Sequence, residues 1–188
     1  MSGIPRRAAP LAARLSALAA AAAAIAAAAL PALSCARPAP RALVPAGYAS
    51  WERTTERDLD YPVPGHEDHR RRIYMNQTGE EVRITERQGR VFHEYPEGTV
   101  IVKEVYEGLQ ARPGETPFQL TVMIKKPQDP LARGGWLWVV RDIATGQERI
   151  IDYEFCYDCH SNANEAHPYG DKNPRGEFRD YVFLPYTE

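Results

Sequence analysis

The sequence predicts an α+β protein, mainly an antiparallel β-sheet with a few short helices. Short runs rich in β-branched and aromatic residues recur between residues 71 and 142, which is typical of strands. Proline and glycine separate these runs, and no long segment shows the 3.6-residue period of an amphipathic helix. Strands alternating with helices, as in a parallel sheet, are therefore not indicated.

Each element rests on a short local pattern. RRIYMN is a compact apolar run before the turn-like NQTG, GTVIVKEVYEG is bounded by glycines, FQLTVMIKK alternates, and GGWLWVVRD opens on a glycine pair. The predicted strands cover residues 71–76, 98–108, 118–126, 134–142 and 180–186. Helix is expected over residues 48–58, and just before and through the cysteine pair near the C-terminus.

The first 35 residues differ from the remainder of the chain. Arg6, Arg7 and Arg14 precede an uncharged, alanine-rich run that ends at Cys35. This basic, apolar and small-residue order is that of an export signal. A transmembrane anchor is the alternative, since the run is long enough to span, but alanine is only weakly hydrophobic. We expect export to the periplasm or to the outer surface of a bacterial membrane.

The segment around Cys35 suggests a domain boundary. ALSC resembles the lipobox of bacterial lipoproteins, with Ala32 where leucine is usual, so a lipoprotein and a plain secreted protein both remain open. Contact with a membrane is expected only through a lipid on Cys35. Residues 36–46 are rich in proline and alanine and predict a linker. Every aromatic residue lies at or after Tyr48, so one domain is expected over 47–188.

Length and charge limit the classes of partner. A domain of this size can bury a substantial core. The formal net charge of the 188-residue chain is −2. A mildly acidic surface gives no reason to expect nucleic acid or an anionic membrane as a partner.

The sequence Cys156-Tyr157-Asp158-Cys159-His160 carries the most chemistry. Zinc sites normally use four ligands, and the other histidines lack zinc-finger spacing. A thioredoxin-type redox pair would precede a helix within a βαβ unit, and that context is missing. A haem interpretation uses every residue: two thiols one helical turn apart reach the porphyrin edge, and the adjacent imidazole reaches the iron. We favour one covalent haem c per chain.

A sixth iron ligand is not evident from the sequence. Met75 and Met123 lie in predicted strands, where core packing is the usual role of methionine. His66 and His69 occupy a charged loop and are interpreted as solvated. An open iron position and a protein sixth ligand both remain hypotheses, and the latter would indicate a simple electron carrier.

A lysine stands among apolar residues in the predicted strand 98–108. Alternation places Thr99, Ile101, Lys103 and Val105 on one face. An amine held on an apolar face tends towards a lowered pKa and nucleophilic character. An edge lysine that reaches water, or one paired with an acid, is the alternative.

The chain resembles the cytochrome P-460 family, which includes the cytochromes c′-beta. The resemblance runs in order through PAGYASW, RRIYMN, YPEGTVIVKEVY, MIKKP, GGWLWV, CYDCH and DYVF. It implies an antiparallel sheet, usually a homodimer, with a haem on Cys156 and Cys159, His160 as proximal ligand, and an open distal position. Hydroxylamine-oxidising members join a lysine covalently to the haem, and the resemblance implies that Lys103 stands at the place of that lysine. A distal arginine is implied as well, matched by Arg71 or, as the alternative, Arg72.

The chain departs from the family at one functional position. Hydroxylamine-oxidising members carry a distal carboxylate, whose place falls at Thr121, with Glu115 and Asp129 as alternative substitutes. Losing a positioned base costs ~100- to 10,000-fold in rate. Three functions therefore remain: a haem oxidoreductase acting on hydroxylamine, a c′-beta-like protein that binds nitric oxide without turnover, and an electron carrier. A redox partner protein is expected.

Overall fold

The computed structural model describes residues 42–183. The predicted export signal, Cys35 and most of the predicted linker lie outside the described residues. Within residues 42–183, no helix is long and apolar enough to cross a membrane.

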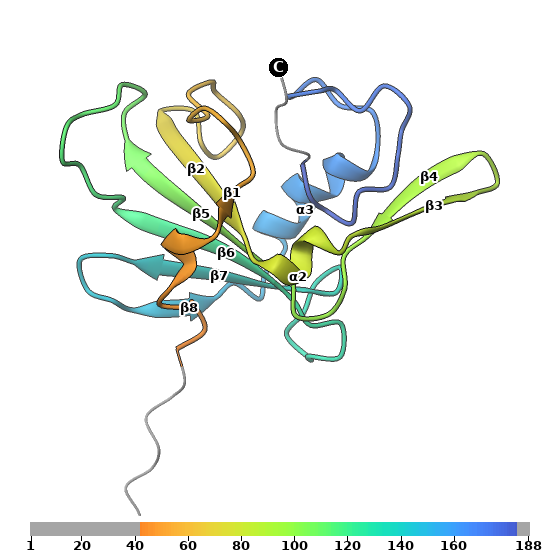
Figure 1. The fold of residues 1–188 in the computed structure, drawn as a ribbon, viewed down its shortest axis with the longest axis horizontal. Helices are drawn as coiled ribbons and strands as arrows, with labels where there is room; N and C mark the ends of the chain where they lie inside the picture. The colour runs from red at the N-terminus through yellow and green to blue at the C-terminus, as the bar shows by residue number, and fades with distance from the viewer. Residues whose placement is uncertain (1–41, 184–188) are drawn as a thin grey trace, which may run out of the picture. The chain divides into compact units, whose positions relative to one another are not determined.

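A six-stranded antiparallel sheet organises the described chain (Figure 1). Its spatial order is β1-β2-β5-β6-β7-β8, and every neighbouring pair is antiparallel. The strands are β1 (Glu52–Arg53), β2 (His69–Met75), β5 (Val100–Glu107), β6 (Gln119–Lys125), β7 (Trp136–Asp142) and β8 (Glu148–Ile150). The mainly antiparallel fold is confirmed, and β2, β5, β6 and β7 correspond to the strands predicted between 71 and 142.

A separate hairpin was not predicted. It consists of β3 (Arg83–Arg87) and β4 (Arg90–Glu94), which extend away from the main sheet in Figure 1. Its two-residue turn, Gln88-Gly89, has positive φ at both residues (52° and 75°), as a type I′ turn requires. The His93 N–H donates to the Phe178 carbonyl at 2.8 Å and ties the hairpin to the C-terminal segment.

The helical elements are short. They are η1 (Tyr48–Ser50), α2 (Gln77–Glu80), α3 (Phe155–Ser161) and η2 (Asn162–Asn164). The helix predicted through the cysteine pair is present as α3, whereas the helix predicted over 48–58 is wrong. Only η1 is helical there, because the chain then pairs as β1 with Met75 and Tyr74.

The strand predicted over 180–186 is absent from its described part, residues 180–183. Asp180 and Tyr181 have φ of 51° and 66°, and a β-strand does not contain such backbone. The remainder of that prediction lies outside the described residues.

The two faces of the sheet bury different groups. We call the face that carries Lys103 the front face and the opposite one the back face. Along β5, Ile101 and Val105 accompany Lys103 on the front, while Val102 and Glu104 point to the back. The back core contains Val44, Val102, Leu120, Val122, Ile124, Leu137 and Val139. The front core contains Tyr95, Ile101, Met123, Trp136, Trp138, Ile151 and Val182.

The folded part begins before the expected boundary at residue 47. Val44 is only 1% exposed and belongs to the back core, with Leu43 packed beside it. Their backbone N–H groups donate to the Glu148 carboxylate at 3.3 and 2.6 Å. Residues assigned to the linker therefore contribute to the core, because two apolar side chains after the proline-rich stretch can be buried.

Candidate haem site

Helix α3 presents its cysteines to the front face. Cys156 and Cys159 are three residues apart and therefore lie on the same side of the helix. Both thiols are free and partly buried, and Cys156 packs against the front core. Burial raises the pKa of each thiol, although the nearby positive charge of Lys103 acts in the opposite direction. The pair therefore faces the strand that carries Lys103.

His160 is held in one tautomer and orientation. Its Nδ1 lies 2.9 Å from the Tyr181 carbonyl oxygen. Because a carbonyl only accepts, Nδ1 carries the proton and Nε2 keeps a free lone pair. The ring packs edge-on against Trp138, with centroids 4.8 Å apart. Burial, followed by the charge of Lys103, lowers the pKa of His160 to about 4, so its imidazole is neutral at pH 7 and can bind a metal.

Lys103 lies opposite Ile73 on β2 and Thr121 on β6, within the front face. Its Nζ is 2.7 Å from Nε2 of His66. Burial, and then the positive charge of Arg71, lowers the pKa of Lys103 to about 8. A substantial fraction of the amine is therefore neutral near pH 8, and a neutral amine is a nucleophile.

His66 was interpreted as solvated, but it is partly buried against Lys103. Burial and the charge of Lys103 lower its pKa to about 2, so it is neutral and accepts a hydrogen bond from the lysine. The sequence feature that could have predicted this position of His66 is the pair Pro64-Gly65 directly before it. The His66 N–H donates to the Val63 carbonyl at 2.9 Å and φ of Gly65 is 78°, which is the turn that a Pro-Gly pair favours. That turn brings His66 back over the sheet.

The register separates Arg71 from Arg72. Arg71 lies on the front face, its charge acts on Lys103, and its pKa is lowered by burial. Its guanidinium donates to the carbonyls of Leu59 and Tyr61. Arg72 lies on the back face, where it bonds the Asp58 carboxylate at 2.9 Å. Of the two arginines considered, Arg71 is the one beside Lys103.

The three positions considered for a distal carboxylate lie in different places. Thr121 is the direct neighbour of Lys103 across the β5–β6 pair, but it carries no carboxylate. Glu115 forms an ion pair with Arg70, which lies over the Tyr106 ring on the back-face side. The Asp129 side chain accepts from the Leu131 N–H at 3.1 Å in the turn after β6. Neither Glu115 nor Asp129 contacts Lys103.

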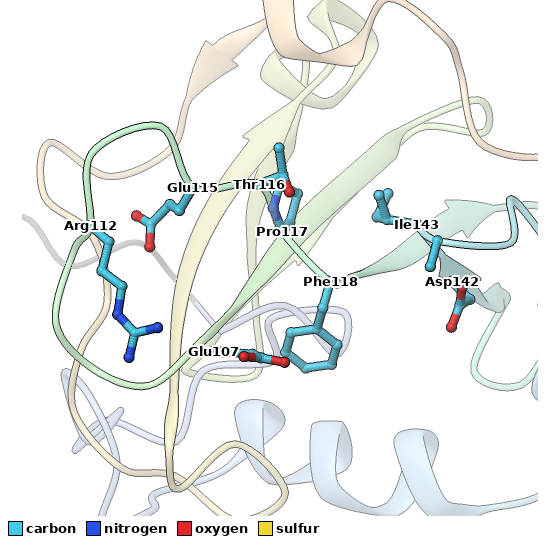
Figure 2. A pocket seen from close by; sticks show the side chains of 9 residues that line it. Glu107, Arg112, Glu115, Thr116, Pro117, Phe118, Asp142 and Ile143 are labelled. Atoms are coloured by element: carbon cyan, nitrogen blue, oxygen red, sulfur yellow. The ribbon is translucent and has the colours of Figure 1, made fainter.

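A cavity of about 460 Å³ opens elsewhere, between the loop after β5 and the turn after β7 (Figure 2). Figure 2 shows Arg112 and Glu115 on one side, and Phe118 beside Glu107. Its lining residues are Glu107, Arg112, Glu115, Thr116, Pro117, Phe118, Asp142, Ile143 and Ala144. Glu115, considered above as a distal carboxylate, lines this cavity, but Lys103, Arg71 and the residues of α3 do not. The cavity is therefore separate from the cysteine pair and His160.

The residues under α3 fit a covalently attached haem. Two free thiols share one helical side, and the adjacent imidazole has its proton on the nitrogen facing away from a metal. Trp138 and the front core supply an apolar wall. Among residues 42–183, no group of three or more His, Cys, Asp or Glu side chains is arranged as a metal site of the zinc type.

Comparison with models of known protein families identifies the family of this chain. Residues 45–184 match the model of the family described as Cytochrome P460. No curated protein matches significantly. The matched range includes the strand of Lys103, the cysteine pair and the segment that contacts His160.

Proposed function

Because the chain belongs to the cytochrome P460 family of covalent haem proteins, we propose that it binds nitric oxide or hydroxylamine at a haem c with an open distal position. Cys156 and Cys159 would hold the haem through thioether bonds, and Nε2 of His160 would bind the iron. When bound, the group supplies an iron centre that coordinates small ligands and exchanges electrons.

One observation carries this proposal. The two free thiols and the Nδ1-protonated imidazole lie on one short helix, directly over the face that carries Lys103. Attachment of the haem needs both thiols on one side of the helix. Binding of iron by Nε2 needs a neutral imidazole, and a hydrogen bond to the other ring nitrogen, Nδ1, holds it in place. All these requirements are met by α3 and its contacts.

The packing of both candidate methionines supports an open distal position. The Sδ of Met75 would lie 2.5 Å from a Cβ built on Gly79, so this side chain is packed against α2. Met123 is 7% exposed and lies within the front core. Both act as core residues, which weakens the electron-carrier hypothesis.

Lys103, Arg71 and His66 give the front face its polar character. The first two are cationic donors, while His66 is neutral, so the group favours a ligand with a partial negative charge or a lone pair. Ile101 and Met123 nearby are each 7% exposed and help to exclude water. Such surroundings suit a small, weakly polar ligand such as nitric oxide.

Oxidation of hydroxylamine is the second candidate. It is supported by Lys103, which has a lowered pKa and stands, by the family resemblance, at the place of the lysine that oxidising members join to the haem. It is weakened by Thr121, which cannot accept a proton as a carboxylate does. Binding without rapid turnover is therefore the better-supported function.

The test uses protein produced in cells with a haem-attachment system. We expect a high-spin, five-coordinate ferrous spectrum, stoichiometric binding of nitric oxide, and slow or no hydroxylamine oxidation. A low-spin, six-coordinate spectrum would identify an electron carrier instead. Absence of attached haem in the wild type would overturn the proposal, and Cys156→Ser with Cys159→Ser provides the haem-free reference.

The proposed setting is the bacterial periplasm or the outer membrane surface, with a redox partner protein and a homodimeric state. The support is the export-like leader and the family resemblance. Fractionation of cells expressing the full chain, with Cys35→Ser as the control for lipidation, tests location. Light scattering of the purified holoprotein tests the dimer.

A further inference from the structure

A short segment after α3 provides the carbonyl that holds His160. We call residues 177–183 the proximal strap. Its Tyr181 carbonyl accepts from Nδ1 of His160 at 2.9 Å, so the position of one peptide group sets this hydrogen bond. Sequence reasoning predicted part of the strap as a strand and assigned it no role.

The strap carries unusual backbone where it meets His160. Asp180 and Tyr181 are consecutive non-glycine residues with φ of 51° and 66°. The left-handed conformation costs ~1–2 kcal/mol per residue for L-amino acids. Backbone of this kind persists only where surrounding contacts hold it, and it concentrates at functional sites.

Asp180 receives most of these contacts. Nζ of Lys125 lies 2.6 and 2.7 Å from its two carboxylate oxygens. The Tyr95 N–H donates to the same carboxylate at 3.2 Å. Nε1 of Trp136 donates to the Asp180 backbone carbonyl at 2.9 Å. Three different segments of the chain therefore fix this one residue, which is only 4% exposed.

A second anchor fixes the peptide groups on either side. The Asn164 Oδ1 accepts from the N–H groups of Arg179 and Tyr181, each at 3.0 Å. The Tyr181 ring also lies directly over Gly134, where an added Cβ would come within 2.6 Å of it. The strap is thus held from the sheet by Asp180 and from η2 by Asn164.

We propose that Asp180 is a positioning residue that fixes the Tyr181 carbonyl on Nδ1 of His160 and so tunes the electron donation of this imidazole to iron. The inference rests on the proposed function, because it requires His160 to be the axial ligand. A hydrogen bond to the outer nitrogen makes a metal-bound imidazole a stronger donor. A stronger donor favours ferric over ferrous iron, so the strap keeps the reduction potential low.

The test measures the iron–histidine bond in the holoprotein. Asp180→Asn removes the charge that holds Lys125, and Trp136→Phe removes the donor to the Asp180 carbonyl. We expect both variants to lower the iron–histidine stretching frequency of the ferrous protein. The preference of His160 for ferric iron should fall about tenfold, which raises the potential of this one-electron couple by about 59 mV.

Asp58→Asn is the matched control. Asp58 is also a partly buried, ion-paired carboxylate, but its partners are Arg53, Arg70 and Arg72 on the back-face side. This variant should lose stability while keeping the wild-type frequency and potential. If Asp180→Asn and Trp136→Phe carry haem with the wild-type frequency and potential, the inference is overturned.

Asn164 keeps the test decisive if Asp180→Asn does not fold. Asn164→Ala should shift frequency and potential in the same direction, and Asn164→Asp, which keeps an acceptor oxygen, should restore them. Equal values in these two variants would overturn the inference. A wild-type chain without an iron–histidine band would overturn the proposed function and this inference together, so the two failures are distinguishable.

Discussion

Lys103 and Lys125 lie on the front face of one sheet, on neighbouring strands, yet their surroundings differ. Lys125 bonds both oxygens of the Asp180 carboxylate at 2.6 and 2.7 Å. Lys103 instead contacts the neutral imidazole of His66, with Arg71 adding positive charge nearby. A lysine with a buried acid is a structural tie, whereas a lysine without one has a lowered pKa and a reactive amine. The presence of a buried carboxylate beside Lys125, and its absence beside Lys103, therefore distinguishes the structural lysine from the reactive one.

The largest effect should come from removing the acid-free lysine. The Lys103 amine would join a haem carbon by replacing its C–H bond with a C–N bond, a two-electron oxidation that releases two protons and for which added hydrogen peroxide serves as the oxidant. We expect a red-shifted, broadened Soret band in the reduced wild type, and an ordinary high-spin c-type spectrum in Lys103→Met. Lys126→Met, at an exposed position just past β6, is the control and should match the wild type. Identical spectra for Lys103→Met and the wild type would contradict this prediction.

A carboxylate at position 121 should supply the proton acceptor that Thr121 does not. Thr121→Glu places a carboxylate directly across from Lys103, where it can take protons from a bound hydroxylamine. We expect hydroxylamine oxidation to rise by ~100-fold, measured with a chemical electron acceptor. Thr121→Gln has nearly the same size without basicity, so its rate should stay at the wild-type level. Equal rates in the two variants would show that a base at this position does not limit turnover.

Stability should respond in the opposite way to the two lysines. Lys125→Met leaves the Asp180 carboxylate buried without its cation, a change that typically costs ~3–5 kcal/mol. Lys103→Met removes only a hydrogen bond to His66 and a poorly compensated charge, so it should change the free energy of unfolding by less than ~1 kcal/mol. Urea denaturation of each holoprotein gives these values. A larger loss in Lys103→Met than in Lys125→Met would reverse the comparison.

The smallest expected effect is a pH dependence of the loss in unfolding free energy that Lys125→Met causes. Burial raises the pKa of Asp180, and the hydrogen bond and charge of Lys125 only partly offset it. Without Lys125 this pKa should rise further. A raised folded pKa means that the folded state binds more protons than the unfolded one, so stability falls as pH rises through that window. The cost of Lys125→Met should therefore shrink from pH 7 towards pH 4, by at most ~1.4 kcal/mol per pH unit.

The pH prediction has its own internal control. Lys126→Met changes an exposed side chain and leaves the Asp180 pair intact, so its difference from the wild type should stay flat between pH 4 and pH 7. Denaturation curves of wild type and both variants at the two pH values provide the measurement. A cost of Lys125→Met that grows on acidification would mean that Asp180 stays ionised without its lysine.

Local sequence patterns were sufficient to predict β2, β5, β6, β7 and α3, but not the β3–β4 hairpin. Alternation along β5 predicted that Lys103 shares a face with Ile101 and Val105, because strand geometry has a fixed two-residue period. The spacing of Cys156 and Cys159 predicted one helical side for the same kind of reason. The helix predicted over 48–58 failed because pairing with β2 outweighed local propensity.

The sequence by itself determined the antiparallel sheet, the haem-type cysteine pair with His160, and the unusual place of Lys103. Only the tertiary structure decided that His66 meets Lys103, and that Arg71 and not Arg72 shares its face. It also decided that the Tyr181 carbonyl meets His160 and that Asp180 pairs with Lys125. The physical reason is how far apart in the sequence the interacting residues lie. Periodicity and motif spacing act over a few residues, whereas these contacts join residues 21 to 55 positions apart, such as His160 with Tyr181 and Lys125 with Asp180. Their partners are fixed by register and packing.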